Sequence, residues 1–526
     1  MRSIIIPAAG KATRMKPLSR GVSKAMIPVN GRPLISYIIN KISEEKDVKE
    51  IIIVENELGD ISEFVARVYP NLDIKCVVQH KPLGPLHAIC TGMTVAEHDK
   101  TGITVWLGDT ICLDEFDYRD SFLAVHLVED PHRWCMVDEY TQLFDKPSCE
   151  VNTDKALIGI YNFAERDLFD IAIADGMSRP DSQGEYQIAE LINAYSSAYG
   201  PLPLKTTSKW YDCGELNTYY ESKARLLNSS ARSFNRIEVD PFYGIVTKSS
   251  DTALGKNKIE VEKKWFAKLR PFQTLFCPRI LDSDEGVLEM SLEPGTALNE
   301  VIVYDNLRPE IWREIIRKIM KIHHEVFYVQ NGIPEYSYEN CFEAYFLKVK
   351  SRMDQVWRHL KMEEDESVTD FVLSTGLELC KSPWWSECIH GDSHLGNILY
   401  EPYTGSIKFV DPKGSFGSME GTAGDLRYDM GKLLQDFYCG YAMIIDGRYH
   451  WDDETCEFSI DWIDGSDDLL QYMEKELEEY GHDVALLKRL SILLLLTAIP
   501  FHEDSERRQR AMYSRALQLI QSLTNI

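Results

Sequence analysis

The sequence predicts a doubly wound α/β domain followed by a bilobal α+β domain. Three observations support this prediction. Short apolar runs alternate with helical patterns up to about residue 115, which is typical of a parallel sheet covered on both faces. A small polar run at residues 228–230 interrupts this pattern. Beyond it, short strands and one helix come first, and long helical stretches at 307–328 and 336–362 follow.

The composition is that of a globular protein with a large negative net charge. The chain has 526 residues, too many for one ordinary core, and 44% of them are hydrophobic. The net charge of −26 disfavours binding to nucleic acid or an anionic membrane, so neither is an expected partner. The twelve cysteines are scattered, and the N-terminal run reads as a strand rather than a signal peptide. These features predict a cytoplasmic protein with reduced thiols.

The first predicted strand, residues 3–8, ends in a glycine turn that is surrounded by positive charge. Gly10 allows the backbone to pass close to a ligand. Four cations follow within fifteen residues: Lys11, Arg14, Lys16 and Lys24. A glycine turn with clustered cations suits a triphosphate. A helix at 33–42 and a strand at 50–54 continue the alternation.

The first 228 residues resemble the sugar nucleotidyltransferases. The family signature appears as PAAGKATRM and SKAMIPV, with Ala12 in place of a second glycine and Ser23 in place of a proline. Further family segments follow in order: QHKPLGPLHAI, VWLGDT, FDKPS, ALIGIYNF, GEYQIAELI and KWYDCGELNTYYES. The resemblance therefore implies a Rossmann-like nucleotidyltransferase domain over residues 1–228.

The same resemblance implies roles for individual residues. Asp109 and Asp212 would hold Mg²⁺, and Lys146 would contact the acceptor phosphate. The catalytic contacts to the nucleotide phosphates would come from Arg14 and Lys24. The remaining nucleotide-binding residues would be Ala8, Ala9 and Gly10 in the loop, and Gln79 and Gly84 at a pyrimidine base edge. Gln79 could instead be a solvated side chain, and His87 is interpreted as a packed helix residue.

A linker at 229–240 is expected to precede the second domain, 241–526, with a small lobe to about 295 and a large lobe beyond it. A strand at 244–248 ends in Lys248, and a helix at about 256–269 carries Glu262. A strand lysine and a helix glutamate fit the ion pair that positions ATP phosphates. Glu260 is the rival partner. In the large lobe, the apolar run 492–499 predicts a core helix, since a bilayer span needs about 20 residues.

The stretch HGDSHLGNILYEPYTGSIKFVDPKG, residues 390–414, has the spacing of a phosphoryl-transfer site. Asp392 is followed five residues later by Asn397, and an apolar strand at 407–410 ends at Asp411. Phosphoryl transfer needs a carboxylate to orient the attacking hydroxyl and oxygen ligands for Mg²⁺. We therefore predict that Asp392 is the catalytic carboxylate and that Asn397 and Asp411 are metal ligands.

These motifs resemble the aminoglycoside phosphotransferase and choline kinase superfamily, whose pattern is H-G-D-x4-N followed by I-D-P-x-G. The resemblance implies a bilobal kinase-like fold, ATP and Mg²⁺, and a structural role for Asp429 in anchoring the loop. His394 and Lys413 stand at variable positions, where they either face the acceptor or are solvated. Trp384 and Trp385 either form a cage for a quaternary ammonium or belong to the core.

Both resemblances together predict a bifunctional enzyme with Mg²⁺ at each site. The second domain would phosphorylate a small metabolite from ATP, and the first would transfer a nucleoside monophosphate to the product. CTP is the favoured nucleotide, with UTP next, and the product would be a precursor of a bacterial surface glycan such as capsule or lipopolysaccharide. One alternative is a sugar kinase joined to a UTP- or dTTP-dependent sugar-1-phosphate enzyme. Another is a non-catalytic regulatory kinase-like module.

Overall fold

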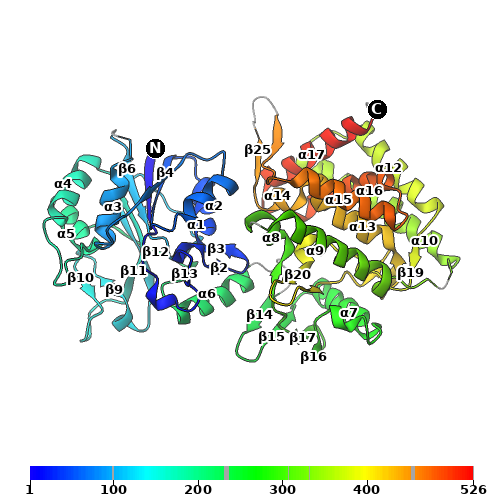
Figure 1. Ribbon diagram of the computed structural model, residues 1–526, viewed down its shortest axis with the longest axis horizontal. Helices are drawn as coiled ribbons and strands as arrows, with labels where there is room; N and C mark the ends of the chain where they lie inside the picture. The colour runs from blue at the N-terminus through cyan, green and yellow to red at the C-terminus, as the bar shows by residue number, and fades with distance from the viewer. Residues whose placement is uncertain (98–99, 230–235, 306, 331, 452–456, 525–526) are drawn as a thin grey trace. The chain divides into compact units, whose positions relative to one another are not determined.

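The computed structural model describes residues 1–97, 100–229, 236–305, 307–330, 332–451 and 457–524. The chain divides into two compact units, Met1–Leu226 and Leu227–Ile526 (Figure 1). The predicted linker requires a correction. Residues 230–235 lie outside the described range, but Arg236–Asp240 form strand β14, which pairs with β15 (Ile245–Ser249). The end of the predicted linker is therefore part of the second unit's sheet.

The first unit is built on a mixed sheet with β1 (Arg2–Pro7) at its centre. β1 pairs in parallel with β4 (Val48–Glu55) and with β6 (Gly102–Trp106), and β5 (Ile74–Val78) extends the parallel part. β11 (Lys155–Phe163) pairs antiparallel to β6. The other strands of this sheet are β8 (Phe122–Leu127), β9 (Cys135–Val137), β10 (Leu143–Asp145) and β12 (Leu204–Thr206). This arrangement confirms the predicted Rossmann-like α/β fold.

Burial on both sides of the sheet explains the continuous apolar runs in the sequence. Ile4, Ile5 and Ile6 are all fully buried in β1, as a strand between two layers requires. Ile5 packs in one cluster with Leu86 and Ile89 of α3. The helices of this unit are α1 (Leu34–Ser43), α2 (Asp60–Val68), α3 (Pro85–Met93), α4 (Arg166–Gly176), α5 (Ile188–Tyr199) and α6 (Leu216–Ser229). Two-stranded pairs add β2 (Pro28–Val29) with β3 (Arg32–Pro33), and β7 (Thr110–Cys112) with β13 (Trp210–Asp212).

The second unit begins with an antiparallel sheet in the order β14-β15-β17-β16, where β16 is Ile280–Asp284 and β17 is Val287–Ser291. Helix α7 (Ala253–Ala267) packs on β15 and β17. It begins three residues before the predicted start, because the Thr252 side chain accepts a hydrogen bond from the Gly255 N–H at 3.1 Å and caps the helix there.

The remainder of the second unit is mostly helical, and two of the predicted helices are interrupted. The stretch 307–328 contains α9 (Pro309–Lys321) and then a π-helical segment, Ile322–Phe327. A second π-helical segment separates α10 from α11. The other helices are α8 (Leu298–Tyr304), α10 (Tyr336–Phe342), α11 (Lys348–Leu360), α12 (Glu366–Lys381), α13 (Leu426–Leu434), α14 (Tyr441–Ile445), α15 (Ser466–Glu479), α16 (Val484–Ala498) and α17 (Glu506–Thr524). The strands of this part are β18 (Thr296–Ala297), β19 (Trp385–Ser386), β20 (Ile398–Glu401), β21 (Ser406–Phe409), β22 (Ser415–Phe416), β23 (Met419–Glu420), β24 (Gly424–Asp425), β25 (Tyr449–Trp451) and β26 (Phe458–Ile460).

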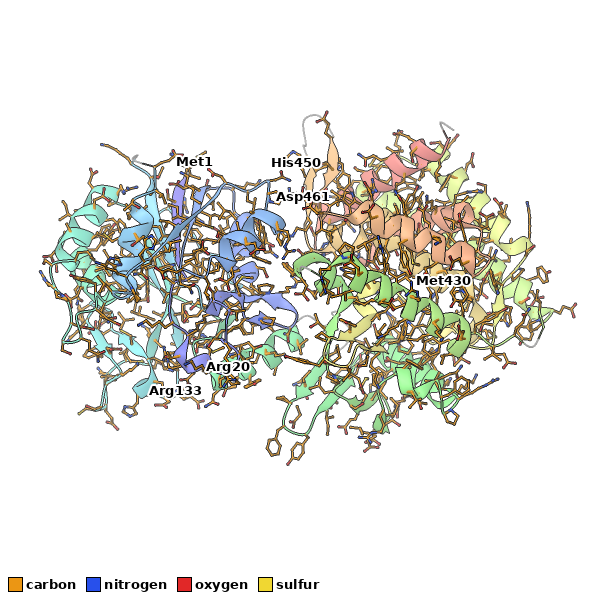
Figure 2. All side chains as sticks on the ribbon, viewed as in Figure 1. Met1, Arg20, Arg133, Met430, His450 and Asp461 are labelled. Carbon is orange, nitrogen blue, oxygen red and sulfur yellow. The ribbon has the colours of Figure 1, made fainter. Side chains whose placement is uncertain are left out.

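Helix α16 is the central helix of this unit, as the sequence predicted. The segment Val484–Phe501 is long and apolar enough to cross a membrane, but 67% of it is buried inside the protein. It packs against α13, where Met430 is fully buried (Figure 2), and against α12 and α17. Its hydrophobicity on all sides is that of a core helix.

Candidate active sites

The loop after β1 lies beside the end of β6. Ala8 and Ala9 are buried, and Gly10 is exposed. The Gly108 N–H donates to the Pro7 carbonyl at 3.2 Å, and a Cβ on Gly108 would lie 3.0 Å from the Ala8 Cβ. Only glycine allows the two strand ends to approach so closely without displacement. The approach brings Asp109 next to the predicted phosphate loop.

Two departures from the family signature have structural explanations in this loop. Ala12 has φ 51° and ψ 33°, the left-handed conformation that favours glycine. Its carbonyl accepts hydrogen bonds from the Met15 N–H at 3.0 Å and the Ser19 hydroxyl at 2.8 Å, which hold the strained turn. Ser23 donates both its N–H, at 2.7 Å, and its hydroxyl, at 2.5 Å, to Asp60. Proline could not donate the first bond, so serine ties the residue before Lys24 to helix α2.

Lys24, Asp109 and Asp212 form the polar centre of the first unit. The Lys24 Nζ lies 2.5 Å from the Asp109 carboxylate. Asp212 stands at the end of β13, opposite Thr110, and the Cys213 N–H donates to the Asp109 carbonyl at 3.0 Å. Burial and the neighbouring Asp109 charge raise the pKa of Asp212 to about 6. Two facing carboxylates with one lysine suit a divalent cation, so these donors fit the Mg²⁺ that the family implies.

Arg14 and Lys146, the two other predicted phosphate contacts, are not seen in contact with Lys24, Asp109 or Asp212 among the described residues. Both side chains are exposed. The Lys146 N–H donates to the Trp134 carbonyl at 3.0 Å, and the Trp134 ring lies 5.0 Å from that of Trp210, two residues before Asp212. This loop therefore runs beside the strand that carries Asp212, and the roles of Arg14 and Lys146 in phosphate binding stay predictions.

Gln79, Gly84 and His87 lie together. Gln79 is 6% exposed, so its alternative as a solvated side chain does not hold. Its amide nitrogen donates to the Gly84 carbonyl at 3.3 Å and to His87 Nδ1 at 2.8 Å. Gly84 has φ 97°, and a Cβ there would lie 2.6 Å from the Tyr186 carbonyl oxygen. Sequence reasoning missed the contact of His87 with Gln79, although their eight-residue separation across a turn could have suggested it.

In the second unit, Lys248 lies between two carboxylates from different elements. Its Nζ is 2.5 Å from Glu262 on α7 and 2.5 Å from Asp411 after β21. Glu260 is not the partner, because it pairs with Lys263 at 2.7 Å. Burial raises the pKa of Glu262 above its usual range, although Lys248 opposes this shift. Asp411 has φ 55°, a backbone strain that is often found at functional positions.

The loop around Asp392 is held by buried groups on the following helices. The Asn397 side-chain nitrogen donates to the Asp392 carbonyl at 2.9 Å, and Lys432 Nζ lies 3.1 Å from the Asp392 carboxylate. Burial disfavours the charged form of Asp392, but Lys432 and His394 outweigh it and hold the Asp392 pKa well below its usual range. Asn397 and Asp411 offer oxygens on the same loop system, which suits Mg²⁺.

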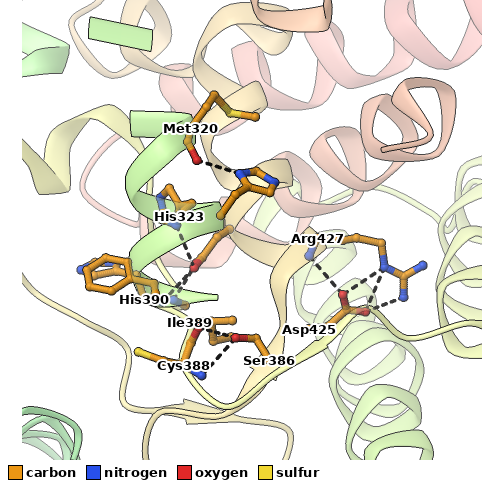
Figure 3. A network of polar contacts seen from close by, with 12 residues as sticks. Met320, His323, Ser386, Cys388, Ile389, His390, Asp425 and Arg427 are labelled. Carbon is orange, nitrogen blue, oxygen red and sulfur yellow. Dashed lines mark hydrogen bonds and ion pairs between the residues drawn. The ribbon is translucent and has the colours of Figure 1, made fainter. Parts of the chain in front are cut away.

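Asp429 anchors this loop, as the resemblance implied. Its carboxylate accepts the N–H groups of His390 at 2.8 Å and Gly391 at 2.7 Å, within the network of Figure 3. Asp436, which sequence reasoning missed, accepts the Leu395 N–H at 2.7 Å. Its position seven residues after Asp429, two turns along the same face, was the available signal.

The start of α13 is fixed by a buried cap. The Asp425 carboxylate accepts the Arg427 N–H at 3.0 Å and an Nε–H of the same arginine at 3.0 Å (Figure 3). Arg427 also donates to the Leu379 carbonyl at 2.6 Å. This cap sets the register of the helix that carries Asp429 and Lys432.

Comparison with known proteins identifies the first unit. Residues 3–229 match the Nucleotidyl transferase family model. The low-salt glycan biosynthesis nucleotidyltransferase Agl11 of Haloferax volcanii is 26% identical over 258 residues, 44% of this chain and 67% of that protein. The UTP–glucose-1-phosphate uridylyltransferase AglF of the same organism is 26% identical, over 37% of this chain and 82% of that protein. The bifunctional protein GlmU of Methanococcus aeolicus is 29% identical over 40% of this chain, and the match spans about half, 51%, of its length. The match covers the segment whose motifs resemble the sugar nucleotidyltransferases, and it supports a nucleotidyltransferase domain there.

Replacing Asp212 should separate activity from stability. We expect Asp212→Asn to lower nucleotidyl transfer by about 100-fold or more, a typical loss for a group that supports transition-state charge. In EDTA at pH 7.5 the variant should melt at a higher temperature than the wild type, because one of two facing charges is gone. Asp145→Asn, an exposed carboxylate on β10, should change neither quantity. A lower melting temperature for Asp212→Asn would contradict the charge argument.

Gly84→Ala tests the Gln79 loop. The new Cβ would clash with the Tyr186 backbone, and the positive φ would add strain, so we expect a loss of about 1–3 kcal/mol of unfolding free energy and a higher KM for the nucleotide. Gly200→Ala is the matched control, because Gly200 has φ 99° with no atom within 4 Å of an added Cβ. Equal effects of the two substitutions in thermal unfolding would show that the Tyr186 contact is unimportant.

Proposed function

We propose that this chain is a bifunctional enzyme that phosphorylates a small metabolite and then activates it. The second unit would transfer the γ-phosphoryl group of ATP to an acceptor hydroxyl. The first unit would transfer a nucleoside monophosphate to the new phosphate and release pyrophosphate. The observation that carries the proposal is a lysine paired with a carboxylate at each site: Lys24 with Asp109 in the first unit, and Lys248 with Glu262 and Asp411 in the second.

The chemistry in the first unit brings two anions together. An oxygen of the acceptor phosphate attacks the α-phosphorus, and the bond from that phosphorus to the bridging oxygen breaks. Bound Mg²⁺, held by Asp109 and Asp212, would offset the charge. Lys24 and Arg14 would contact the nucleotide phosphates over the loop 8–10, and Lys146 would contact the acceptor phosphate.

In the second unit, Asp392 would orient the acceptor hydroxyl and take its proton. Its low pKa keeps it ionised at neutral pH, as this role requires. Lys248, positioned by Glu262, would contact the ATP phosphates. Asn397 and Asp411 would hold Mg²⁺, which would offset charge on the phosphates. The Lys248–Asp411 contact keeps the carboxylate at the site where this ion would bind.

We propose a pyrimidine nucleotide for the first unit. The buried Gln79 beside Gly84 supports base recognition, and the relative AglF is named for its use of UTP. This relative moves UTP ahead of CTP, the nucleotide that the sequence alone favoured. The name of Agl11 supports a product that serves glycan biosynthesis, consistent with a surface polysaccharide precursor. A sugar-1-phosphate made by a sugar kinase fits this proposal equally.

Binding of five nucleoside triphosphates tests base recognition. In thermal unfolding with Mg²⁺, the pyrimidine nucleotides UTP, CTP and dTTP should stabilise the protein more than the purine nucleotide GTP at equal concentration. A ligand at 100 times its dissociation constant adds about 2.7 kcal/mol, which such an experiment resolves. ATP is expected to bind the second unit, so its effect is compared in Asp392→Asn and Lys248→Met backgrounds. Equal shifts with UTP, CTP and GTP would contradict base reading by Gln79.

Asp392→Asn tests whether the second unit is an enzyme or a regulatory module. We expect phosphoryl transfer to fall by about 100-fold or more, because the proton acceptor is lost, while ATP affinity stays within a few-fold. Asp354→Asn, an exposed carboxylate on α11, is the matched control and should be fully active. The measurement is ADP release with a panel of acceptors. A wild-type protein that binds ATP but phosphorylates none of them would favour the regulatory module.

A further inference from the structure

Four cations form a cluster at Asp392 in the second unit: Lys432, Lys413 and Arg352 act on the Asp392 charge, and Lys348 lies next to them through Lys413 and Arg352. Lys348 and Arg352 come from α11, Lys432 comes from α13, and Lys413 lies in the loop after Asp411. Each side chain is partly buried rather than extended into solvent. They originate from segments up to 84 residues apart, so the fold and not a local charge run assembles them. Of these four, the sequence offered only Lys413, as a residue that either faces the acceptor or is solvated.

Lys432 and Arg352 are held in place by contacts with neighbouring groups. Lys432 pairs with the Asp392 carboxylate at 3.1 Å. Arg352 donates to the Thr497 carbonyl at 3.0 Å and lies 4.3 Å above the ring of Phe501. The arginine is therefore held in place by neutral groups, and its charge is not cancelled by an ion pair among the described residues.

The positive charge of Lys413 acts on Lys348, and no described carboxylate forms an ion pair with either lysine. Lys413 Nζ donates to the Tyr428 hydroxyl at 3.1 Å and lies 4.1 Å from the centre of that ring. Within the described residues, neither lysine forms an ion pair with a carboxylate. The nearby Lys413 charge, followed by burial, lowers the pKa of Lys348 to about 8. Mutual repulsion disfavours the charged forms of neighbouring lysines, and a bound anion would offset it.

The carboxylates that act on the cluster do not remove this excess of positive charge. Asp392 is paired with Lys432, and Asp429 is buried against the N–H groups of His390 and Gly391. Glu343 attracts Lys348 only over a longer distance. An acidic chain of net charge −26 has thus gathered cations at the one carboxylate that would face the acceptor.

We propose that Lys348, Arg352 and Lys413 bind the anionic group of the phosphoryl acceptor, a small hydroxylated carboxylic acid or phosphate ester. This inference rests on the proposed kinase function. The acceptor hydroxyl oxygen would bond to the γ-phosphorus, the bond from that phosphorus to ADP would break, and the hydroxyl proton would pass to Asp392. The anionic group would lie against the cluster and hold the hydroxyl in line.

The same geometry disfavours a cationic acceptor. The ring face of Tyr428 that a quaternary ammonium would need is occupied by Lys413. Trp385 is 3% exposed and packs against Phe416, so it belongs to the core, as one of the two sequence interpretations had it. The Trp384 ring lies 4.1 Å from that of His482. The tryptophan pair therefore forms no cage around Asp392.

Matched acceptors test the inference by ADP release from Mg-ATP. The pairs are glycerate with glycerol, glucuronate with glucose, and glycerol 3-phosphate with ethanolamine, so that carboxylate, phosphate, neutral and cationic groups are distinguished. We expect turnover with an anionic member and at least 10-fold lower kcat/KM with its partner. Turnover only with neutral or cationic acceptors would overturn this inference and leave the kinase function standing. No turnover with any acceptor would count against the kinase function itself.

A lysine pair on α11 provides the variant and its control. Lys348→Met should raise KM for the anionic acceptor at least 10-fold and change KM for ATP less than 2-fold. Lys350→Met, exposed on another face of the same helix, should change neither. A higher KM for ATP with an unchanged KM for the acceptor would show that the cluster binds the nucleotide, and the inference would fail.

Inorganic phosphate gives a test that does not need the acceptor. At constant ionic strength, phosphate should raise the melting temperature of the wild type and of Lys350→Met, and the shift should be smaller in Lys348→Met. The result decides the inference even if no acceptor in the panel reacts. Equal shifts in all three proteins, or no shift in any, would overturn it.

Discussion

Repulsion between phosphate anions is the constraint that both units would have to meet in the proposed reactions. In the first unit, Lys24 pairs with Asp109, and the charge of Asp109 acts on the nearby Asp212. In the second, Lys248 lies between Glu262 and Asp411. In each case the three groups come from separate elements, so the local arrangement exists only after folding. An arrangement of this kind can exchange a lysine contact for a metal or phosphate contact without reorganising the backbone. The close approach of Gly108 to the loop after β1 positions Asp109, and the buried Asp429 holds the loop that contains Asp392.

The overall charge of the chain also affects how it could bind anionic ligands. The chain is strongly acidic, so any anionic ligand depends on cations that the fold brings together locally. Arg14 and Lys146 of the first unit are exposed, whereas Lys348 and Lys413 of the second are partly buried. Partial burial strengthens electrostatic recognition, because the local dielectric is lower than that of water. A small anionic acceptor would therefore be selected mainly at the second site, before it is activated at the first.

The sequence predicted the α/β fold of the first unit and the pairing of Lys248 with Glu262, because strand ends, glycines and spacing carry that information locally. It could not predict Lys432 or Asp436, since their roles depend on how α13 packs beside the loop that contains Asp392. It also treated Ser23 only as a departure from a signature. Its two bonds to Asp60 are contacts across 37 residues, which local pattern does not reveal. The predicted linker was too long because β14 pairs only after the sheet forms.

The most direct test of the account follows a phosphorus atom through both reactions. The protein is incubated with Mg²⁺, ATP labelled with ³²P at the γ-position, an acceptor and a pyrimidine nucleoside triphosphate, and the products are separated by chromatography. The account predicts that the label appears in a nucleoside-diphosphate-linked product, at the phosphate joined to the acceptor. Formation of such a product only from an acceptor phosphate that is supplied ready-made, with no label from ATP, would contradict the claim that the two units act in sequence.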